Sequence, residues 1–388
     1  MTPGGRMRIL VAMSGGVDSS VAAALLVQEG HEVVGATMKT FCYKESAGPS
    51  RTCCGLDGIL DARRVADHLG IPHFVFDVEE EFARDVVDDF VAEYAQGRTP
   101  NPCVRCNANT KFRDLLRRGR ALGCDRIATG HYARMRTAAA GESHLLRGVD
   151  REKDQAYFLW GLPTSLLPLL HFPLGGRSKP QVREQARTLG LATADKPESQ
   201  EICFVPDGNY RGFLERKLPQ LHPALQPGTV VLSDGRVVGD HSGYAGFTVG
   251  QRKGLGGGFD RPHFVLEIRP QTREVVVGPM EELYASEMWV EGVNWLTGTP
   301  PTPGGEVAVQ IRHRAPGVRA AVLEVDEGVL LRFKEPQRAV SPGQSAAMFA
   351  GERLLGGGRI ARALTPEASA LSTPRHGAGH SGMIARDE

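Results

Sequence analysis

Hydrophobic and polar positions in the first third of the chain follow two alternating periods. Residues 8–12 (RILVA) and 31–38 (HEVVGATM) are apolar runs of strand length, and residues 125–132 contain one more. Between them, residues 18–30 and 55–70 place apolar side chains at the 3.6-residue spacing of a helix and end on glycine. Repeated strand–helix–strand units predict an α/β fold with a parallel sheet that carries helices on both faces.

The pattern changes after about residue 208. Short β-rich runs such as GTVVLS, HFVLEIR and EVVVG are separated by Gly, Pro and Asp, which is typical of small antiparallel barrels. We therefore expect an amino-terminal catalytic domain followed by two small β-rich domains, the last a β-barrel. The expected ranges are 1–207, 208–284, 285–364 and a disordered tail at 365–388, which is rich in Ala, Ser, Gly and Pro.

Composition limits the class of protein. The chain has 388 residues, 41% of them hydrophobic, and a formal net charge of +1, so no global field indicates nucleic acid. No leader-like segment and no apolar run of about 18 residues is present. We expect a cytoplasmic protein with no membrane partner, in which the seven cysteines are reduced.

The stretch VAMSGGVDSS suggests an anion site. A strand leads into a turn that contains Ser14, Gly15 and Gly16, and a helix follows near Asp18. Glycines let backbone N–H groups approach an anion, and the helix start adds further N–H groups and partial positive charge. Because no lysine follows the glycines, this is not the GxxxxGK[ST] loop. The sequence predicts phosphate binding of a different kind.

The thiols pose a second question. Cys103 and Cys106 stand three apart in TPNPCVRCN, and Cys203 lies far downstream in PESQEICFVPD. A CxxC pair is compatible with half a zinc site, a redox pair, ligands of a cluster, or chance. Zinc is disfavoured because the further ligands have the wrong spacing, and a structural disulfide is disfavoured by the compartment.

Eight motifs occur in one order along residues 8–362: SGGVDSS, GRTPNPCVRCN, ATGHYAR, KDQAYFLW, ESQEICFV, GQRKGLGGG, IRHR and SPGQSAAMF. In this the chain resembles the MnmA (TrmU) family of bacterial tRNA-specific 2-thiouridylases, within the PP-loop ATP pyrophosphatases. The resemblance implies that ATP, with Mg²⁺, adenylates the C2 oxygen of the wobble uridine of a tRNA and releases pyrophosphate. Sulfur then replaces that oxygen, and AMP leaves.

The resemblance also implies roles for single residues. Cys203 is expected to carry the sulfur as a persulfide and Cys106 to be the nucleophile, so that a Cys106–Cys203 disulfide forms and is reduced in each cycle. A persulfide donor protein or relay is expected to load Cys203. Contacts with the nucleotide are expected from Ala12, Met13, Ser14, Gly15, Gly16, Val17, Asp18, Ser19, Met38 and Gly130.

A second set of residues is expected to contact tRNA, and the carboxyl-terminal barrel is expected to take part. Taken one at a time, such histidines and polar residues are more often structural. Many relatives have aspartate where this chain has Cys103, so the role of that position is open. The expected tRNA contacts are Asn101, Pro102, Cys103, His131, Lys153, Asp154, Gln155, Arg312, His313 and Gln344.

Other functions remain to be weighed. Cys103, Cys106 and Cys203 could ligate three irons of a [4Fe–4S] cluster in a thiolation at another tRNA position. An ATP-dependent amidating ligase could use the same loop, but the chain shows no glutaminase domain and the cysteines would be idle. A non-catalytic RNA-binding module would not need the intact SGGVDS loop.

Overall fold

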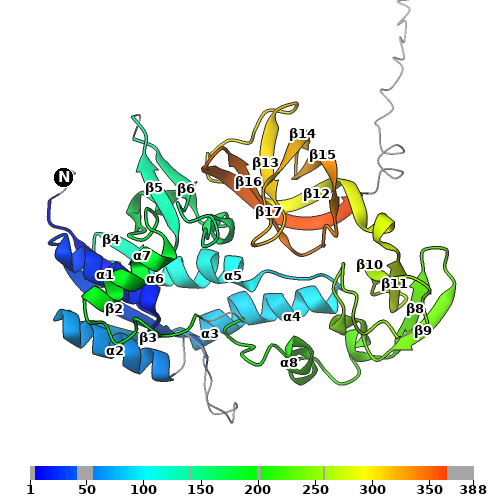
Figure 1. Ribbon diagram of the computed structural model, residues 1–388, viewed down its shortest axis with the longest axis horizontal. Helices are drawn as coiled ribbons and strands as arrows, with labels where there is room; N and C mark the ends of the chain where they lie inside the picture. The colour runs from blue at the N-terminus through cyan, green and yellow to red at the C-terminus, as the bar shows by residue number, and fades with distance from the viewer. Residues whose placement is uncertain (1–4, 42–55, 140, 199–201, 257, 365–388) are drawn as a thin grey trace, which may run out of the picture.

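The computed structural model describes residues 5–41, 56–139, 141–198, 202–256 and 258–364. The predicted tail at 365–388 lies outside the described residues, as do three of the seven cysteines (Cys42, Cys53 and Cys54). Figure 1 shows a helix-covered sheet at one side of the molecule and two β-rich units at the other. A helical arm crosses between them.

The amino-terminal part is built on a parallel sheet. In the described residues its strand order is β3-β2-β1-β4-β7, and every neighbouring pair is parallel. The strands predicted from the short apolar runs are therefore confirmed, with β1 at the centre of the sheet. The strands are β1 (Arg8–Ala12), β2 (Glu32–Lys39), β3 (His73–Asp77), β4 (Arg126–Thr129) and β7 (Leu170–His171).

Helices cover both faces of this sheet, as the pattern predicts. Successive side chains of a strand point to opposite faces. Ile9 and Val11 accordingly pack with one group of helices, and Leu10 packs with the opposite one. The first group is α1 (Val17–Gln28), α2 (Leu56–Leu69) and α7 (Lys179–Thr188), and the other face holds α6 (Phe112–Ala121).

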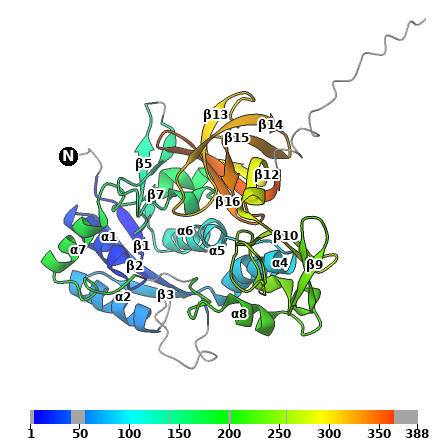
Figure 2. The same cartoon turned by 45° about the vertical axis from the view of Figure 1, so that its right-hand side comes forward.

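A helical arm leads from β3 to the β-rich units (Figures 1 and 2). Its aromatic side chains, Phe82 and Phe90 among them, share a core with Val265 and Val277 of the first β-rich unit, called the middle unit below (strands within residues 228–278). The arm therefore packs against that unit through a common hydrophobic cluster. It consists of α3 (Glu79–Phe82), the π-helical turn η2 (Ala83–Val87), α4 (Asp88–Ala95), α5 (Pro102–Arg105) and the π-helical turn η3 (Cys106–Lys111).

The middle unit corrects one expectation. Its described strands form a sheet of order β10-β11-β8-β9, and β11 pairs with β8 in parallel, so the predicted purely antiparallel pattern is wrong. The apolar runs specified the strands but not their pairing, which depends on how the connections cross. The strands are β8 (Gly228–Leu232), β9 (Val237–His241), β10 (Phe264–Arg269) and β11 (Glu274–Gly278), and α8 (Tyr210–Lys217) precedes them.

The carboxyl-terminal unit is a closed antiparallel barrel, as predicted. Within the described residues, six strands follow one another around it, and pairing of β12 with β17 closes the ring. A hairpin from the amino-terminal part, β5 (Ala133–Thr137) and β6 (Ser143–Arg147), extends the same sheet at β17. The barrel strands are β12 (Tyr284–Trp295), β13 (Glu306–Gln310), β14 (Val318–Val325), β15 (Gly328–Arg338), β16 (Ser345–Ala350) and β17 (Arg353–Leu364).

The barrel and the parallel sheet share a hydrophobic cluster. Leu10 of β1 and Leu115 of α6 belong to it together with Phe349 and Leu354 of the barrel. The barrel is thus packed onto the sheet and its helices. In the part of the chain that the structure describes, no helix combines the length and apolar character needed to cross a bilayer.

Candidate active site

A cleft of about 380 Å³ opens at the carboxyl ends of the parallel strands, where ligands of such sheets bind. It brings the glycine loop and the three singled-out cysteines to one place, although they lie far apart in the sequence. Thirteen of the residues expected from the sequence line it: Ala12, Met13, Ser14, Asp18, Ser19, Met38, Pro102, Cys103, Cys106, Gly130, His131, Gln155 and Cys203.

The glycine loop has a conformation that depends on Gly15. Its φ of 73° is in the left-handed region, and an added Cβ would stand 2.1 Å from the carbonyl oxygen of Gly58 in α2. Only glycine combines this backbone with this close approach. Gly16 is the N-cap of α1, and its carbonyl accepts from the Ser19 and Ser20 hydroxyls at 3.1 and 2.8 Å.

Gly130 packs against the backbone of the glycine loop where α1 begins. It directly follows β4, and a Cβ there would lie 2.8 Å from the backbone nitrogen of Ser19. Any side chain would push the turn after β4 away from the first turn of α1. Gly15, Gly16 and Val17 form the loop without lining the cleft.

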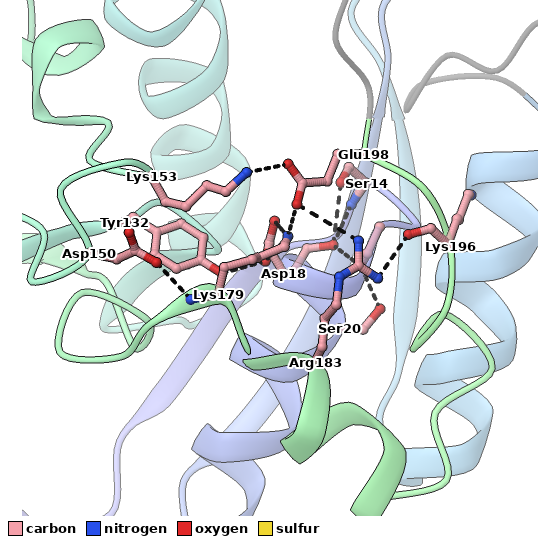
Figure 3. Close-up of polar contacts among 12 residues, drawn as sticks. Ser14, Asp18, Ser20, Tyr132, Asp150, Lys153, Lys179, Arg183, Lys196 and Glu198 are labelled. Atoms are coloured by element: carbon pink, nitrogen blue, oxygen red, sulfur yellow. Dashed lines mark hydrogen bonds and ion pairs between the residues drawn. The ribbon is translucent and has the colours of Figure 1, made fainter. Parts of the chain in front are cut away.

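Asp18 is held by a lysine that the sequence did not single out. Both carboxylate oxygens accept from Lys179 Nζ at 2.8 Å, and one also accepts from the Tyr132 hydroxyl at 2.8 Å (Figure 3). Lys179 is only 6% exposed and stands at the start of α7. A cation is unfavourable at a helix N-terminus, so its position there is a signal that the sequence could have provided.

Glu198 connects this lysine to a second one. One of its carboxylate oxygens lies 3.1 Å from Lys179 Nζ, and the other lies 2.8 Å from Lys153 Nζ (Figure 3). The pKa of Glu198 is lowered because the ammonium groups outweigh the effect of burial, which acts in the opposite direction and is the largest single influence. Lys196 in turn donates to the Gly15 carbonyl at 2.9 Å and to Asp61 at 2.6 Å. Three lysines therefore lie around the loop, and each of them is paired with a carboxylate.

The cysteines approach the cleft from two directions. Cys103 lies in α5 and is exposed, and Cys106 opens η3 and is half-buried. Cys203 is also half-buried, and with Cys106 it packs against one aromatic cluster that includes Phe82 and Phe204. π-Helical turns are frequent at functional sites. The cleft lining adds Lys111, at the end of this turn, as a cation that sequence reasoning missed.

The surroundings of His131 favour its neutral form. Its Nδ1 lies 2.7 Å from the Thr129 hydroxyl, and its ring packs against Phe112 and Phe172. Burial, with a smaller contribution from Lys111, lowers the pKa of His131 well below its usual value near 6.5. An uncharged imidazole can hydrogen-bond or stack on a ligand but brings no charge.

Several residues expected to contact tRNA make contacts within the chain. Asp154 is 8% exposed and accepts from Arg147 at 2.6 Å and from the Gly148 N–H at 2.9 Å. The Gln155 side-chain oxygen accepts from the Tyr132 N–H at 3.0 Å. Asp154 and Gln155 therefore order this turn, while the Lys153 ammonium binds Glu198.

The tRNA contacts expected from the barrel lie outside the cleft lining. Arg312 donates to the carbonyls of Arg338 and Ala339, and the His313 ring stands 4.4 Å from that of Phe158. Neither lines the cleft, nor does Asn101, the N-cap of α5. Gln344 donates to carbonyls of residues 99 and 100, next to the cysteines.

Metal ligation has little support from the side chains. Among the residues described, no three His, Cys, Asp or Glu side chains are placed to share a metal ion. The three cysteines line one cleft without forming such a group. As they are placed here, the three thiols are not gathered into one ligand group.

Family profiles match most of the chain in three parts. A profile described as the tRNA methyl transferase HUP domain matches residues 7–207, and one described as the tRNA methyl transferase PRC-barrel domain matches residues 211–279. The profile of the aminomethyltransferase beta-barrel domain matches residues 285–360. The three profiles together cover the parallel sheet, the mixed sheet and the barrel.

Curated relatives match over almost their whole length. A protein of Geobacter metallireducens named tRNA-specific 2-thiouridylase MnmA is 49% identical over 372 residues, which is 94% of this chain and 100% of the relative. Proteins of the same name from Carboxydothermus hydrogenoformans and Rhodospirillum centenum are 48% and 46% identical. They cover 93% and 96% of this chain, and 99% and 96% of their own lengths are matched.

Proposed function

Because the chain belongs to the family of tRNA-specific 2-thiouridylases, we propose that it replaces the C2 oxygen of the wobble uridine of tRNA with sulfur at the expense of ATP. The observation that carries this proposal is the single cleft that holds the SGGVDS loop, Cys106 and Cys203. A phosphate-binding loop supports activation of an oxygen, and adjacent thiols support its replacement by sulfur. Amidation or methyl transfer would give these thiols no task.

ATP is the proposed co-substrate, with its phosphates on the glycine loop. The helix start at Gly16 offers N–H groups and partial positive charge to a phosphate. Lys111 of the cleft lining would offset charge on the phosphates, while Met38 and Gly130 flank the space left for the nucleoside. The α-phosphorus accepts the uridine C2 oxygen, and pyrophosphate leaves.

Mg²⁺ fits this arrangement only as a companion of ATP. Mg²⁺ binds through one or two carboxylates together with substrate phosphates and water, and Asp18 is the carboxylate in the cleft lining. When bound, the ion would offset charge on the phosphates. The chain's own part is to hold Asp18 in place through Lys179 and Tyr132.

Sulfur transfer is proposed to use both cleft cysteines. The terminal sulfur of a Cys203 persulfide attacks C2, the C2–O bond to the adenylate breaks, and AMP leaves. The Cys106 thiolate then attacks the Cys203 sulfur and breaks the S–S bond, so the thiocarbonyl sulfur stays on the base. The resulting Cys106–Cys203 disulfide is reduced before the next cycle by an external dithiol, which gives up two electrons and becomes a disulfide itself. A persulfide donor protein reloads Cys203.

Analysis of tRNA nucleosides tests the proposal. Unmodified tRNA is incubated with the protein, ATP, Mg²⁺ and a low-molecular-weight persulfide, then digested and analysed by mass spectrometry. We expect 2-thiouridine at the wobble position, with AMP and pyrophosphate formed in step with it. Cys106→Ser and Cys203→Ser should each lower the rate by about 100-fold or more.

Cys124→Ala is the matched control. Cys124 is buried in the cluster on the α6 face of the sheet and does not line the cleft, so thiolation should continue at the wild-type rate. Full activity of Cys106→Ser, or thiolation at another nucleoside, would refute the proposal. Stoichiometric iron and acid-labile sulfide in anaerobically purified active protein would favour the cluster route instead.

A further inference from the structure

A turn of the barrel is hydrogen-bonded to the backbone that leads into α5, the helix that contains Cys103 and directly precedes Cys106. The turn at residues 341–344 joins β15 to β16. Its Pro342 carbonyl accepts from the Thr99 N–H at 2.8 Å. The Gln344 side-chain nitrogen donates to the carbonyls of Thr99 at 3.0 Å and Pro100 at 3.3 Å. Three hydrogen bonds thus fix two residues that directly precede Asn101, the N-cap of α5.

The contact is close as well as polar. Gly343 has a φ of 90°, and an added Cβ would stand 2.7 Å from the Thr99 backbone nitrogen. The backbone of the turn therefore contacts the backbone at Thr99 directly, without side chains between them. Such a contact transmits a shift of the barrel directly to the residues before the cysteines.

A charge network holds the other end of the same segment. Arg359 of β17 binds both Asp89 oxygens at 2.9 and 2.8 Å and Glu93 at 2.8 Å. Asp89 also lies 3.5 Å from Arg105 Nε, and Arg105 directly precedes Cys106. The carboxylates of α4 therefore connect the barrel to the residue beside the nucleophile.

A second arginine also connects α4 to the barrel. Arg98, directly before Thr99, binds Glu93 and also Glu291 of the barrel strand β12 at 2.9 Å. Glu93 is only 3% exposed, so its ion pairs with Arg98 and Arg359 are shielded from solvent. Buried, charge-assisted bonds of this kind fix geometry more firmly than exposed pairs.

From these contacts we infer that the barrel positions Cys106, with Gln344 and Arg359 as positioning residues. This role in thiolation rests on the proposed function. The contacts of Gln344 and Arg359 with the segment before Cys106 do not depend on that function. The barrel then contributes to the chemical step and not only to the affinity for RNA. Gln344 acts on the loop through its amide, rather than on tRNA as the resemblance implies.

Gln344→Met tests this inference because it keeps the length of the side chain and removes the donor. Misplacement of a reacting group by about 1 Å can lower a rate about 100-fold. We expect kcat for thiolation to fall about 10- to 100-fold, while KM for tRNA changes less than about twofold. Arg359→Met should act in the same way, and Arg359→Lys should recover part of kcat because the charge returns.

The reactivity of the Cys106 thiol supplies a readout that needs no turnover. Trypsin cleaves after Arg98, Arg105 and Lys111, so Cys103 and Cys106 fall in separate peptides. Loss of one hydrogen bond shifts a local equilibrium by about 3- to 10-fold. Alkylation of half-buried Cys106 by iodoacetamide should become faster by that factor in Gln344→Met, and its pH profile should change. Alkylation of buried Cys124 should not change.

Gln337→Met is the matched control. Gln337 lies on β15, and its side chain donates at 2.8 Å to the Glu335 carbonyl within the barrel. The same substitution there should leave kcat, KM and Cys106 alkylation as in the wild type.

Two results would overturn the inference. A raised KM for tRNA with unchanged kcat and unchanged Cys106 alkylation in Gln344→Met would assign the amide to RNA. Equal effects of Gln344→Met and Gln337→Met would show that both substitutions act only by lowering the stability of the barrel. If the wild-type protein does not thiolate tRNA, the proposed function fails, and the alkylation rates still decide the positioning role.

Discussion

At the scale of single residues, the glycine loop shows how backbone geometry limits sequence. Gly15 and Gly30 both have a positive φ, of 73° and 83°. Only Gly15 also faces a neighbouring backbone, the Gly58 carbonyl oxygen at 2.1 Å from an added Cβ, whereas nothing lies within 4 Å at Gly30. The pair therefore separates the conformational effect of an added methyl group from its steric effect.

Alanine at these two positions should give different outcomes. Gly30→Ala should lower the free energy of unfolding by about 1 kcal/mol, the usual effect at a left-handed position, and leave ATP use intact. Gly15→Ala should force the loop away from α2, with a loss of about 3 kcal/mol or more and of tRNA-dependent pyrophosphate release. Urea unfolding and a pyrophosphate assay measure both. Equal effects of the two substitutions would contradict the steric argument.

At the scale of elements, α7 is tied to the glycine loop by charge. Its first residue, Lys179, carries a buried ammonium that binds Asp18 of α1 and Glu198. The site therefore needs the first turn of α7 beside the first turn of α1. No periodicity of the sequence encodes that placement.

Lys179→Met should destabilise the protein and impair ATP use together. Removal of the buried ammonium takes a shared partner from Asp18, which is one-third exposed, and from Glu198, and should cost up to about 3 kcal/mol. A double-mutant cycle with Asp18→Asn, followed by urea unfolding, should give a coupling energy of about 1–3 kcal/mol. Arg187→Met on the same helix, whose partners Glu184 and Asp195 are exposed, is the control and should change stability by less than about 0.5 kcal/mol. A coupling energy near zero would show that the ion pair does not connect the two helices.

At the scale of the whole molecule, buried and half-buried histidines make the stability depend on pH. Burial is the largest cause that lowers the pKa of each, and they are spread over the parallel sheet and the mixed sheet. Their folded-state pKa lies below the unfolded value near 6.5, so the unfolded chain binds more protons as the pH falls below that value. They are His73, His131, His171 and His241.

Acidification from pH 7.5 to 5.5 should therefore lower the free energy of unfolding by at least about 1 kcal/mol. The melting temperature, followed by differential scanning fluorimetry at constant ionic strength, should fall through this range. His131→Gln should make the dependence on pH shallower, whereas His68→Gln, at an exposed position, should not. A melting temperature that rises on acidification would show that the sign is wrong.

The sequence by itself determined the strands, the helices and the motifs. Apolar runs and 3.6-residue spacing are local properties, and β1, α1 and α2 accordingly lie where they were predicted, to within one or two residues. The motif order identified the family, and five of the loop residues and the three cysteines that it singled out line one cleft. The domain limits at 207 and 284, and the roles of the individual site residues, stay predictions.

Only the tertiary structure decided which charges face one another. Lys179, Lys196 and Glu198 reach the loop because α7 packs against α1, and Gln344 reaches Thr99 because the barrel packs on the arm. The parallel pairing of β11 with β8 also depends on a long connection rather than on either strand. The physical reason is common to all three: hydrophobic periodicity specifies a face to be buried, but the partner for that face is set by packing between distant segments.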